Sequence, residues 1–155
     1  GDKIDIIVHR ESIIHSMVEY IDNSVIAQLS VPDMRHCVQY ALELPERHHA
    51  VIPPLDLAKI SKLTFADADE DTFIPLRLAR ESLSLGGAAS AVLHSANEVA
   101  VTRFLEGKIK FTDIFDTLEY ICAEMKQASN STSLEEILNC VATAAQMADE
   151  YLVRK

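Results

Sequence analysis

From about residue 71 to the C-terminus, apolar residues recur at three- and four-residue spacing, and this pattern constrains the fold more than any other feature. An α-helix turns once in about 3.6 residues, so such spacing gathers apolar side chains on one face. Breaks fall at Gly86-Gly87, at Gly107 and in the polar run 127–132, which is predicted to be a loop. We therefore predict a bundle of three main helices with a leading fourth.

The last helix has a clear start, because Ser133 and Glu136 form an S-x-x-E capping box. The spacing also predicts which side chains the bundle buries. The residues predicted to line the buried faces, in chain order, are Leu76, Leu78, Ala79, Leu83, Leu85, Val92, Leu93, Ala96, Val99, Ala100, Phe104, Leu105, Ile114, Phe115, Leu118, Ile121, Cys122, Met125, Leu134, Ile137, Leu138, Val141, Ala145, Ala148 and Leu152.

The first part of the chain reads instead as β structure. A short apolar run covers residues 4–8, and two strand-like runs, 13–21 and 24–29, flank Asp22-Asn23. Asn and Asp tolerate positive φ, so this pair suits a tight hairpin turn. Neither face of the hairpin is cleanly polar, which predicts a sheet covered on both faces or a face lent to a partner.

A short helix is predicted after the hairpin, over about residues 34–44, with Asp33 as its N-cap and Pro45 at its end. The following stretch to residue 70 carries prolines and regularly placed apolar residues, so we expect a connector that is packed down. The predicted fold class is therefore α+β: a small β-hairpin segment, then a connector, then a C-terminal α-helical bundle. The boundaries that we assign are 1–50, 51–70 and 71–155.

Composition removes several classes of function. The formal net charge of −10 argues against non-specific binding to nucleic acid or to an anionic membrane, since both depend on Lys and Arg. No apolar run approaches the ~18–20 residues that span a bilayer. Cys37, Cys122 and Cys140 are far apart and form no C-x-x-C pair, so we expect reduced thiols, with Cys122 and Cys140 buried on helix faces.

The sequence contains no metal-binding or phosphate-binding motif of a known kind. Six histidines are present, but none stands in an H-E-x-x-H pattern, and no Gly-rich phosphate loop exists. We therefore predict no metal ligands in this chain. The unusual residues gather in the first 36 positions: Ser12 and His15 flank the start of a strand, and Pro32 and Met34 follow its hairpin. Polar groups at strand ends beside a helix start form a plausible pocket rim.

Several segments together resemble the 1-deoxy-D-xylulose 5-phosphate (DXP) reductoisomerase family. Residues 12–18, 22–29 and 32–35 resemble the run SxIHSMV…DGSVxAQL…PDMR of that family. Arg10-Glu11 departs from the usual Pro-Gln after His9, and Asn23 replaces the turn glycine. The resemblance is specific because the matching segments follow in order over nearly the whole chain. These segments are 12–18, 22–29, 32–35, 54–56, 63–66, 96–101 and 111–114.

The resemblance implies an oxidoreductase that isomerises DXP and reduces the rearranged aldehyde with NADPH, giving 2-C-methyl-D-erythritol 4-phosphate in non-mevalonate isoprenoid biosynthesis. It implies a divalent metal (Mg, Mn or Co) that polarises the carbonyl as a Lewis acid. The dinucleotide domain and the metal ligands lie N-terminal to the matching segments in the family. For this chain it implies a pocket wall, with Ser12 and His15 on the substrate side and Pro32 and Met34 near the nicotinamide.

The resemblance further implies that residues 1–50 are the end of a catalytic and dimerisation domain, that the protein is a homodimer through its β segment, and that the isolated chain is inactive. It implies a bacterial cytoplasm, or a plastid stroma or apicoplast. An alternative remains open at this point: a non-catalytic helical module that serves association and has lost the chemistry. A structural role for His15, as a strand histidine satisfied by a partner sheet, also remains open.

Overall fold

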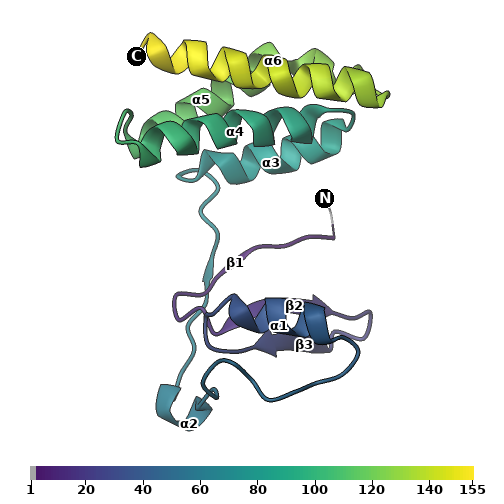
Figure 1. Cartoon of the computed structure of the whole chain (residues 1–155), viewed down its shortest axis with the longest axis vertical. Coiled ribbons are helices and arrows are strands. Elements are labelled where there is room, and N and C mark those ends of the chain that lie inside the picture. Colours follow the sequence, from purple (N-terminus) through teal and green to yellow (C-terminus); the bar gives the residue numbers. More distant parts are fainter. Residues whose placement is uncertain (1–2) are drawn as a thin grey trace. The chain divides into compact units, whose positions relative to one another are not determined.

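The computed structural model describes residues 3–155 and divides the chain into two compact units. The sheet unit comprises residues 5–68, and the bundle unit comprises residues 69–155 together with Lys3 and Ile4. The order of elements along the chain, a hairpin followed by helices, confirms the predicted α+β class (Figure 1). The division at residues 50 and 70 remains a proposal. No helix within residues 3–155 is both long and apolar enough to span a membrane.

The bundle unit is built from helices α3 to α6 and one 3₁₀ turn. Helix α4 is central, because it packs against α3, α5 and α6 (Figure 1). Helix α6 begins at the predicted capping box: the Ser133 side chain accepts the Glu136 N–H, and the Glu136 carboxylate accepts the Ser133 N–H at 3.1 Å. The elements are α3 (Ile74–Leu85), α4 (Ala89–Leu105), α5 (Phe111–Glu124), η1 (Lys126–Asn130) and α6 (Leu134–Val153).

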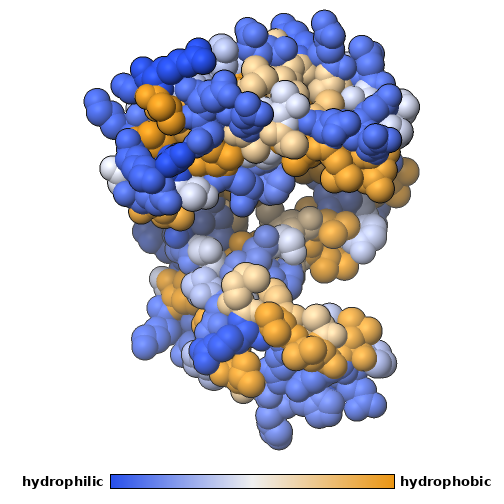
Figure 2. Space-filling model, turned by 45° about the horizontal axis from the view of Figure 1, so that its top comes forward, coloured by the Kyte–Doolittle hydropathy of each residue, from blue (hydrophilic) through white to orange (hydrophobic). Residues whose placement is uncertain are grey.

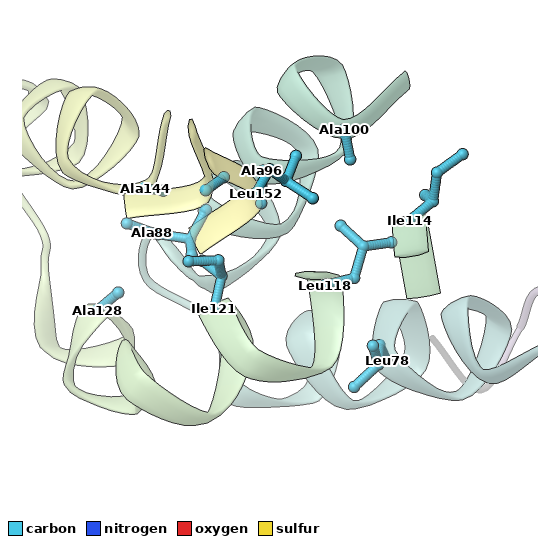
Figure 3. Packing of buried hydrophobic residues seen from close by; sticks show 12 residues of the cluster. Leu78, Ala88, Ala96, Ala100, Ile114, Leu118, Ile121, Ala128, Ala144 and Leu152 are labelled. Atoms are coloured by element: carbon cyan, nitrogen blue, oxygen red, sulfur yellow. The ribbon is translucent and has the colours of Figure 1, made fainter. Parts of the chain in front are cut away.

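A single apolar core lies between these helices (Figure 3). Small residues of α4 and α6 let the two helices approach closely, and larger side chains of α5 fill the space beside them. Leu118 and Ile121 of α5 are 2% and 0% exposed, at the positions that the spacing predicted. The buried members of the core are Leu78, Ala88, Val92, Ala96, Ala100, Ile114, Leu118, Ile121, Ala128, Ala144, Ala148 and Leu152.

The predicted buried face of α3 is partly wrong. Leu78 is buried, but Leu83 and Leu85 are 46% and 53% exposed, and Ser82 is buried instead. Contacts with α4 and α5 select the face of α3 that carries Leu78 and Ser82, one turn apart, whereas the leucine-rich end of the helix points outward. Similar exposure is found for four further residues predicted to be buried: Ala79, Leu105, Leu134 and Leu138.

The run 127–132 was predicted to be a polar loop, and this is also corrected. It overlaps the 3₁₀ turn η1 (Lys126–Asn130), whose Ala128 is buried in the core. The Ala128 carbonyl accepts the Ala88 N–H at 2.9 Å, so the turn is fixed to the start of α4. Cys122 and Cys140 are half-buried, Cys37 is exposed, and all three thiols are free. Burial raises the pKa of the Cys122 thiol.

The sheet unit contains two separate two-stranded ribbons. The hairpin pairs β2 (Ile14–Glu19) with β3 (Val25–Leu29), and Asn23 takes the positive φ of 64° that its turn requires. The second ribbon pairs β1 (Ile7–Val8) with β4 (Ala66–Asp67) in antiparallel register. The unit also holds two helices, α1 (Arg35–Glu43) and α2 (Leu57–Ile60).

Helix α1 begins one residue later than predicted, with Met34 at its N-cap. Asp33 still satisfies the start of the helix, because its carboxylate accepts the Arg35 N–H at 3.0 Å and pairs with the Arg35 guanidinium. This guanidinium holds the pKa of Asp33 at about 2. Helix α1 buries no residue, and Leu42 is 82% exposed.

Apolar side chains lie open on the surface of the sheet unit (Figure 2). The register places Val18 opposite Ile26 on one face of the hairpin and Met17 opposite Ala27 on the other. Val18 and Ile26 are 56% and 62% exposed, and Met17 is 41% exposed. Both faces of the hairpin therefore carry exposed apolar residues, whereas the sequence predicted a sheet covered on both faces or a face lent to a partner.

Candidate functional site

The candidate site is the turn that leads into β2, and it is organised around His15. The strand register shifts between Ile14 and Ser16, so His15 occupies a β-bulge and has no direct partner on β3. Its ring reaches three groups: Nε2 lies 2.9 Å from the Ser12 carbonyl oxygen, and Nδ1 lies 3.2 Å from Gln28 Oε1 and 3.3 Å from Ser30 Oγ. The bulge therefore takes the His15 side chain out of the regular alternation of side chains between the two faces of the hairpin.

Ser12 forms the corner of the same turn. Its φ of 52° lies in the left-handed region, which a serine rarely adopts. The Ser12 N–H donates to the His9 carbonyl at 3.2 Å, and the Ser12 carbonyl faces His15. The structure therefore brings together the two residues that were predicted to form the substrate side of a pocket, and both side chains are exposed.

Pro32 and Met34 lie on the segment between β3 and α1. Both are exposed, Met34 by 75%. The segment begins at Ser30, which is buried: its N–H donates to the Ile13 carbonyl, and its hydroxyl donates to the Val31 carbonyl. Ser30 also lies within reach of His15, so one buried serine connects the two halves of the predicted rim.

A cluster that sequence reasoning missed supports this turn, and we call it the His9 clamp (His9, Glu11, Thr64 and Phe65). The His9 ring stacks on Phe65 with centroids 4.8 Å apart, and its side chain is 6% exposed. The Glu11 carboxylate accepts the Thr64 hydroxyl at 2.7 Å and the Thr64 N–H at 3.1 Å. These hydrogen bonds lower the pKa of Glu11.

The arrangement offers hydrogen-bonding groups and an imidazole at an open surface, which suits recognition of a polar or anionic ligand. Within residues 3–155, no group of three or more His, Cys, Asp or Glu residues is placed to hold a metal ion.

Comparison with known proteins identifies the class to which this fold and site belong. A family model described as the DXP reductoisomerase C-terminal domain matches residues 29–147. A 1-deoxy-D-xylulose 5-phosphate reductoisomerase of Clostridium botulinum is 49% identical over 138 residues, which are 89% of this chain and 36% of the relative. One of Pelodictyon phaeoclathratiforme is 48% identical over 152 residues, covering 98% and 40% of the two chains.

Solved structures of reductoisomerases match the fold of this chain. The Zymomonas mobilis reductoisomerase in complex with NADPH has a TM-score of 0.83 and 38% identity, and the match covers 96% of this chain and 39% of that one. A DOX-P reductoisomerase in complex with NADPH, fosmidomycin and magnesium has a TM-score of 0.86 and 36% identity, with 94% and 38% covered. The chain belongs to the 1-deoxy-D-xylulose 5-phosphate reductoisomerase family. It spans 36% and 40% of the two curated relatives' lengths.

Proposed function

We propose that this chain forms one wall of the active site in a longer NADPH- and divalent-metal-dependent reductoisomerase. That enzyme would convert DXP to 2-C-methyl-D-erythritol 4-phosphate in non-mevalonate isoprenoid biosynthesis. The observation that carries the proposal is the 48% identity to a reductoisomerase over 98% of this chain. The relatives are bacterial, so we propose a bacterial cytoplasm as the compartment, or a plastid stroma or apicoplast if the source is eukaryotic.

Both cofactors are assigned mainly to the part of the longer protein that would precede this chain. Related structures hold NADPH and magnesium, whereas residues 3–155 offer no cluster of metal-ligating side chains. We expect the chain alone to be inactive with DXP, NADPH and a divalent metal, because one wall of a pocket cannot assemble the reacting groups.

The roles proposed for the site residues follow from where they lie. Ser12 and His15 share one exposed turn, and we assign them to the phosphorylated sugar, since an imidazole and a hydroxyl both hydrogen-bond anionic oxygens. Pro32 and Met34 present apolar surface before α1, and we assign them to the nicotinamide side. A related structure is a complex with NADPH, fosmidomycin and magnesium, which supports the assignment of this chain to a ligand-binding enzyme.

We also propose a homodimer through the β segment. A two-stranded ribbon is marginal in water on its own, and both faces of this hairpin carry exposed apolar residues. Val18 and Ile26 lie opposite each other on one face, so a partner sheet could bury them together. The test is sedimentation equilibrium on the longer protein. We expect a dimer that Val18→Lys weakens, and a monomer at micromolar concentration would contradict the proposal.

A chimaera tests the activity. The part of the Clostridium botulinum relative that precedes its match would be joined to this chain, and NADPH oxidation would be followed with DXP and magnesium. We expect activity in the chimaera and none in the chain alone. An inactive chimaera that is folded and dimeric would favour the alternative, a non-catalytic association module, which the exposed apolar hairpin equally suits.

Within the active chimaera, His15→Gln separates a substrate role from a structural one. We expect kcat/KM for DXP to fall by roughly ten- to a hundredfold while KM for NADPH stays within about twofold. The matched control is His48→Gln, because His48 is an exposed histidine of the same unit, 57% open to solvent. Unchanged DXP kinetics in His15→Gln would assign His15 a structural role.

A further inference from the structure

The His9 clamp lies directly beside the candidate site, and the proposed function does not use it. His9 follows β1, and Thr64 and Phe65 precede β4, so the clamp joins parts of the chain that are 55 residues apart. The His9 side chain is only 6% exposed, although this unit has very few buried side chains. A polar side chain that is buried in this way needs hydrogen-bond partners.

The hydrogen bonds of His9 fix its protonation pattern. Its Nδ1 lies 2.9 Å from the Thr64 carbonyl oxygen and 3.1 Å from Glu11 Oε2, and both of these groups only accept. Its Nε2 lies 3.2 Å from the Ile13 nitrogen, whose N–H must donate. His9 therefore carries its proton on Nδ1 and a lone pair on Nε2, which is the neutral ring in its Nδ1–H form.

This ring shapes the turn that carries the site. The Ile13 N–H is held by His9 Nε2, and the Ser12 N–H is held by the His9 carbonyl. With both of these N–H groups fixed, Ser12 takes its left-handed conformation and its carbonyl is aimed at His15 Nε2. Since a carbonyl has no hydrogen to donate, this contact requires the His15 proton on Nε2.

We propose that His9 is a positioning residue for Ser12 and His15, and that Glu11 and Thr64 hold its ring in the form that the turn requires. The chain of contacts runs from Glu11 and Thr64 to His9 Nδ1, and from His9 Nε2 to the turn. The consequence for catalysis rests on the proposed function, whereas the coupling between His9 and the turn does not.

Nuclear magnetic resonance of the chimaera, with ¹⁵N- and ¹³C-labelled histidine and backbone, measures the coupling through a readout other than activity. We expect His9 to show the Nδ1–H tautomer, Ser12 to show the Cα and Cβ shifts of a left-handed residue, and His15 to show a hydrogen-bonded Nε2–H. In His9→Ala, the Ser12 and His15 signatures should both be lost, while the amide signals of residues 69–155 stay in place. His9→Gln should restore part of the effect, because an amide oxygen can accept the Ile13 N–H.

The control is His48→Ala, which should change neither signature. If His9→Ala unfolds the hairpin, Glu11→Ala decides: the ring then loses one of its two acceptors at Nδ1, and we expect a mixture of His9 tautomers together with a weakened His15 signal. An Nε2–H tautomer of His9 in the unaltered chimaera would overturn the proposal. So would unchanged Ser12 and His15 signatures in both His9→Ala and Glu11→Ala.

Kinetics of the chimaera then test the consequence. We expect His9→Gln to lower kcat for DXP several-fold and His9→Ala to lower it by about tenfold or more, with KM for NADPH nearly unchanged. An inactive unaltered chimaera, combined with the expected resonance changes, would remove the proposed function and leave the positioning role standing. An active chimaera that His9→Ala does not slow would remove the catalytic consequence of the positioning role.

Discussion

The bundle unit has a continuous interior, whereas the sheet unit has almost none. The core cluster of the bundle extends from Leu78 to Leu152, but Ile13 is the one buried apolar residue between Asp5 and Ala68. Burial of apolar surface is the main favourable term in folding. The difference indicates that the bundle is stabilised by its own packing, while the sheet unit needs further surface to cover it. A chain that spans 36–40% of its relatives' lengths is consistent with such a need.

Separating the two units tests most directly whether only the bundle unit folds by itself. We expect residues 69–155 to give a helical circular dichroism spectrum and a cooperative melt, because their core is complete. Residues 5–68 alone should show no cooperative transition, since conformational entropy exceeds what their burial offsets. A non-cooperative melt of residues 69–155 would mean that the bundle depends on the sheet unit.

Matched leucine truncations in the two units sharpen the same point. Leu118→Ala should lower the free energy of unfolding by about 3–5 kcal/mol, because the side chain is 2% exposed and its removal leaves a cavity. Leu42→Ala, in helix α1 of the sheet unit, should change it by less than about 0.5 kcal/mol, since Leu42 is 82% exposed. Chemical denaturation monitored at 222 nm, the standard helix wavelength, measures both. Equal effects would contradict the contrast between the units.

Two glycines of the bundle unit, Gly87 and Gly107, test how closely its turns are packed. A Cβ on Gly87 would lie 2.3 Å from the Ser129 carbonyl oxygen, and its φ is 55°. Gly87→Ala should therefore cost about 2–4 kcal/mol. Gly107 has a φ of 70° with no atom within 4 Å, so Gly107→Ala should cost only about 1 kcal/mol from the backbone. If Gly87→Ala and Gly107→Ala lower the melting temperature equally, the close contact between Gly87 and η1 adds nothing to the cost of the substitution.

The smallest effect concerns the start of α6. The pKa of Glu136 is lowered from its ordinary 4.5 mainly by the N–H of Ser133, then by that of Thr132. A carboxylate with a lowered folded-state pKa contributes stability that is present above the unfolded value and is lost as pH falls through the folded one. Glu136→Gln should lower the melting temperature above about pH 5, and the difference should shrink towards pH 2. Glu135→Gln, outside the capping box, should show no such convergence.

Features set by neighbouring residues were predictable from the sequence. The capping box at Ser133 and the turn at Asn23 both depend on contacts within a few positions, so their residue types indicated their geometry. The burial of Ala128 and the outward face of Leu83 depend on which helices pack together, and no local pattern records that. Composition hid η1 as well, because the other four of its five residues are polar and only Ala128 enters the core.

The candidate site divides in the same way. Ser12 and His15 were found because their segment carries the family's pattern, and the structure brings them into contact. Their roles with a substrate remain a prediction, as do those of Pro32 and Met34. The bulge at His15 was missed because both faces of this strand carry apolar residues, so an interruption of the alternation is not visible in the sequence. Thr64 was missed because it meets Glu11 across 53 positions, although Glu11 had already stood out as a departure from the usual Pro-Gln.

That long separation has a consequence for the order of folding. The hairpin closes a short loop and can form within microseconds, whereas the pairing of β1 with β4 and the contact from His9 to Thr64 must close a loop of more than 50 residues. Contacts of large sequence separation are slow to form because their closure entropy is lost before any stabilising interaction is gained. We therefore expect the Ser12 turn to reach its final conformation last within the sheet unit. Nascent chains would then carry a complete hairpin before the turn beside it can recognise a ligand.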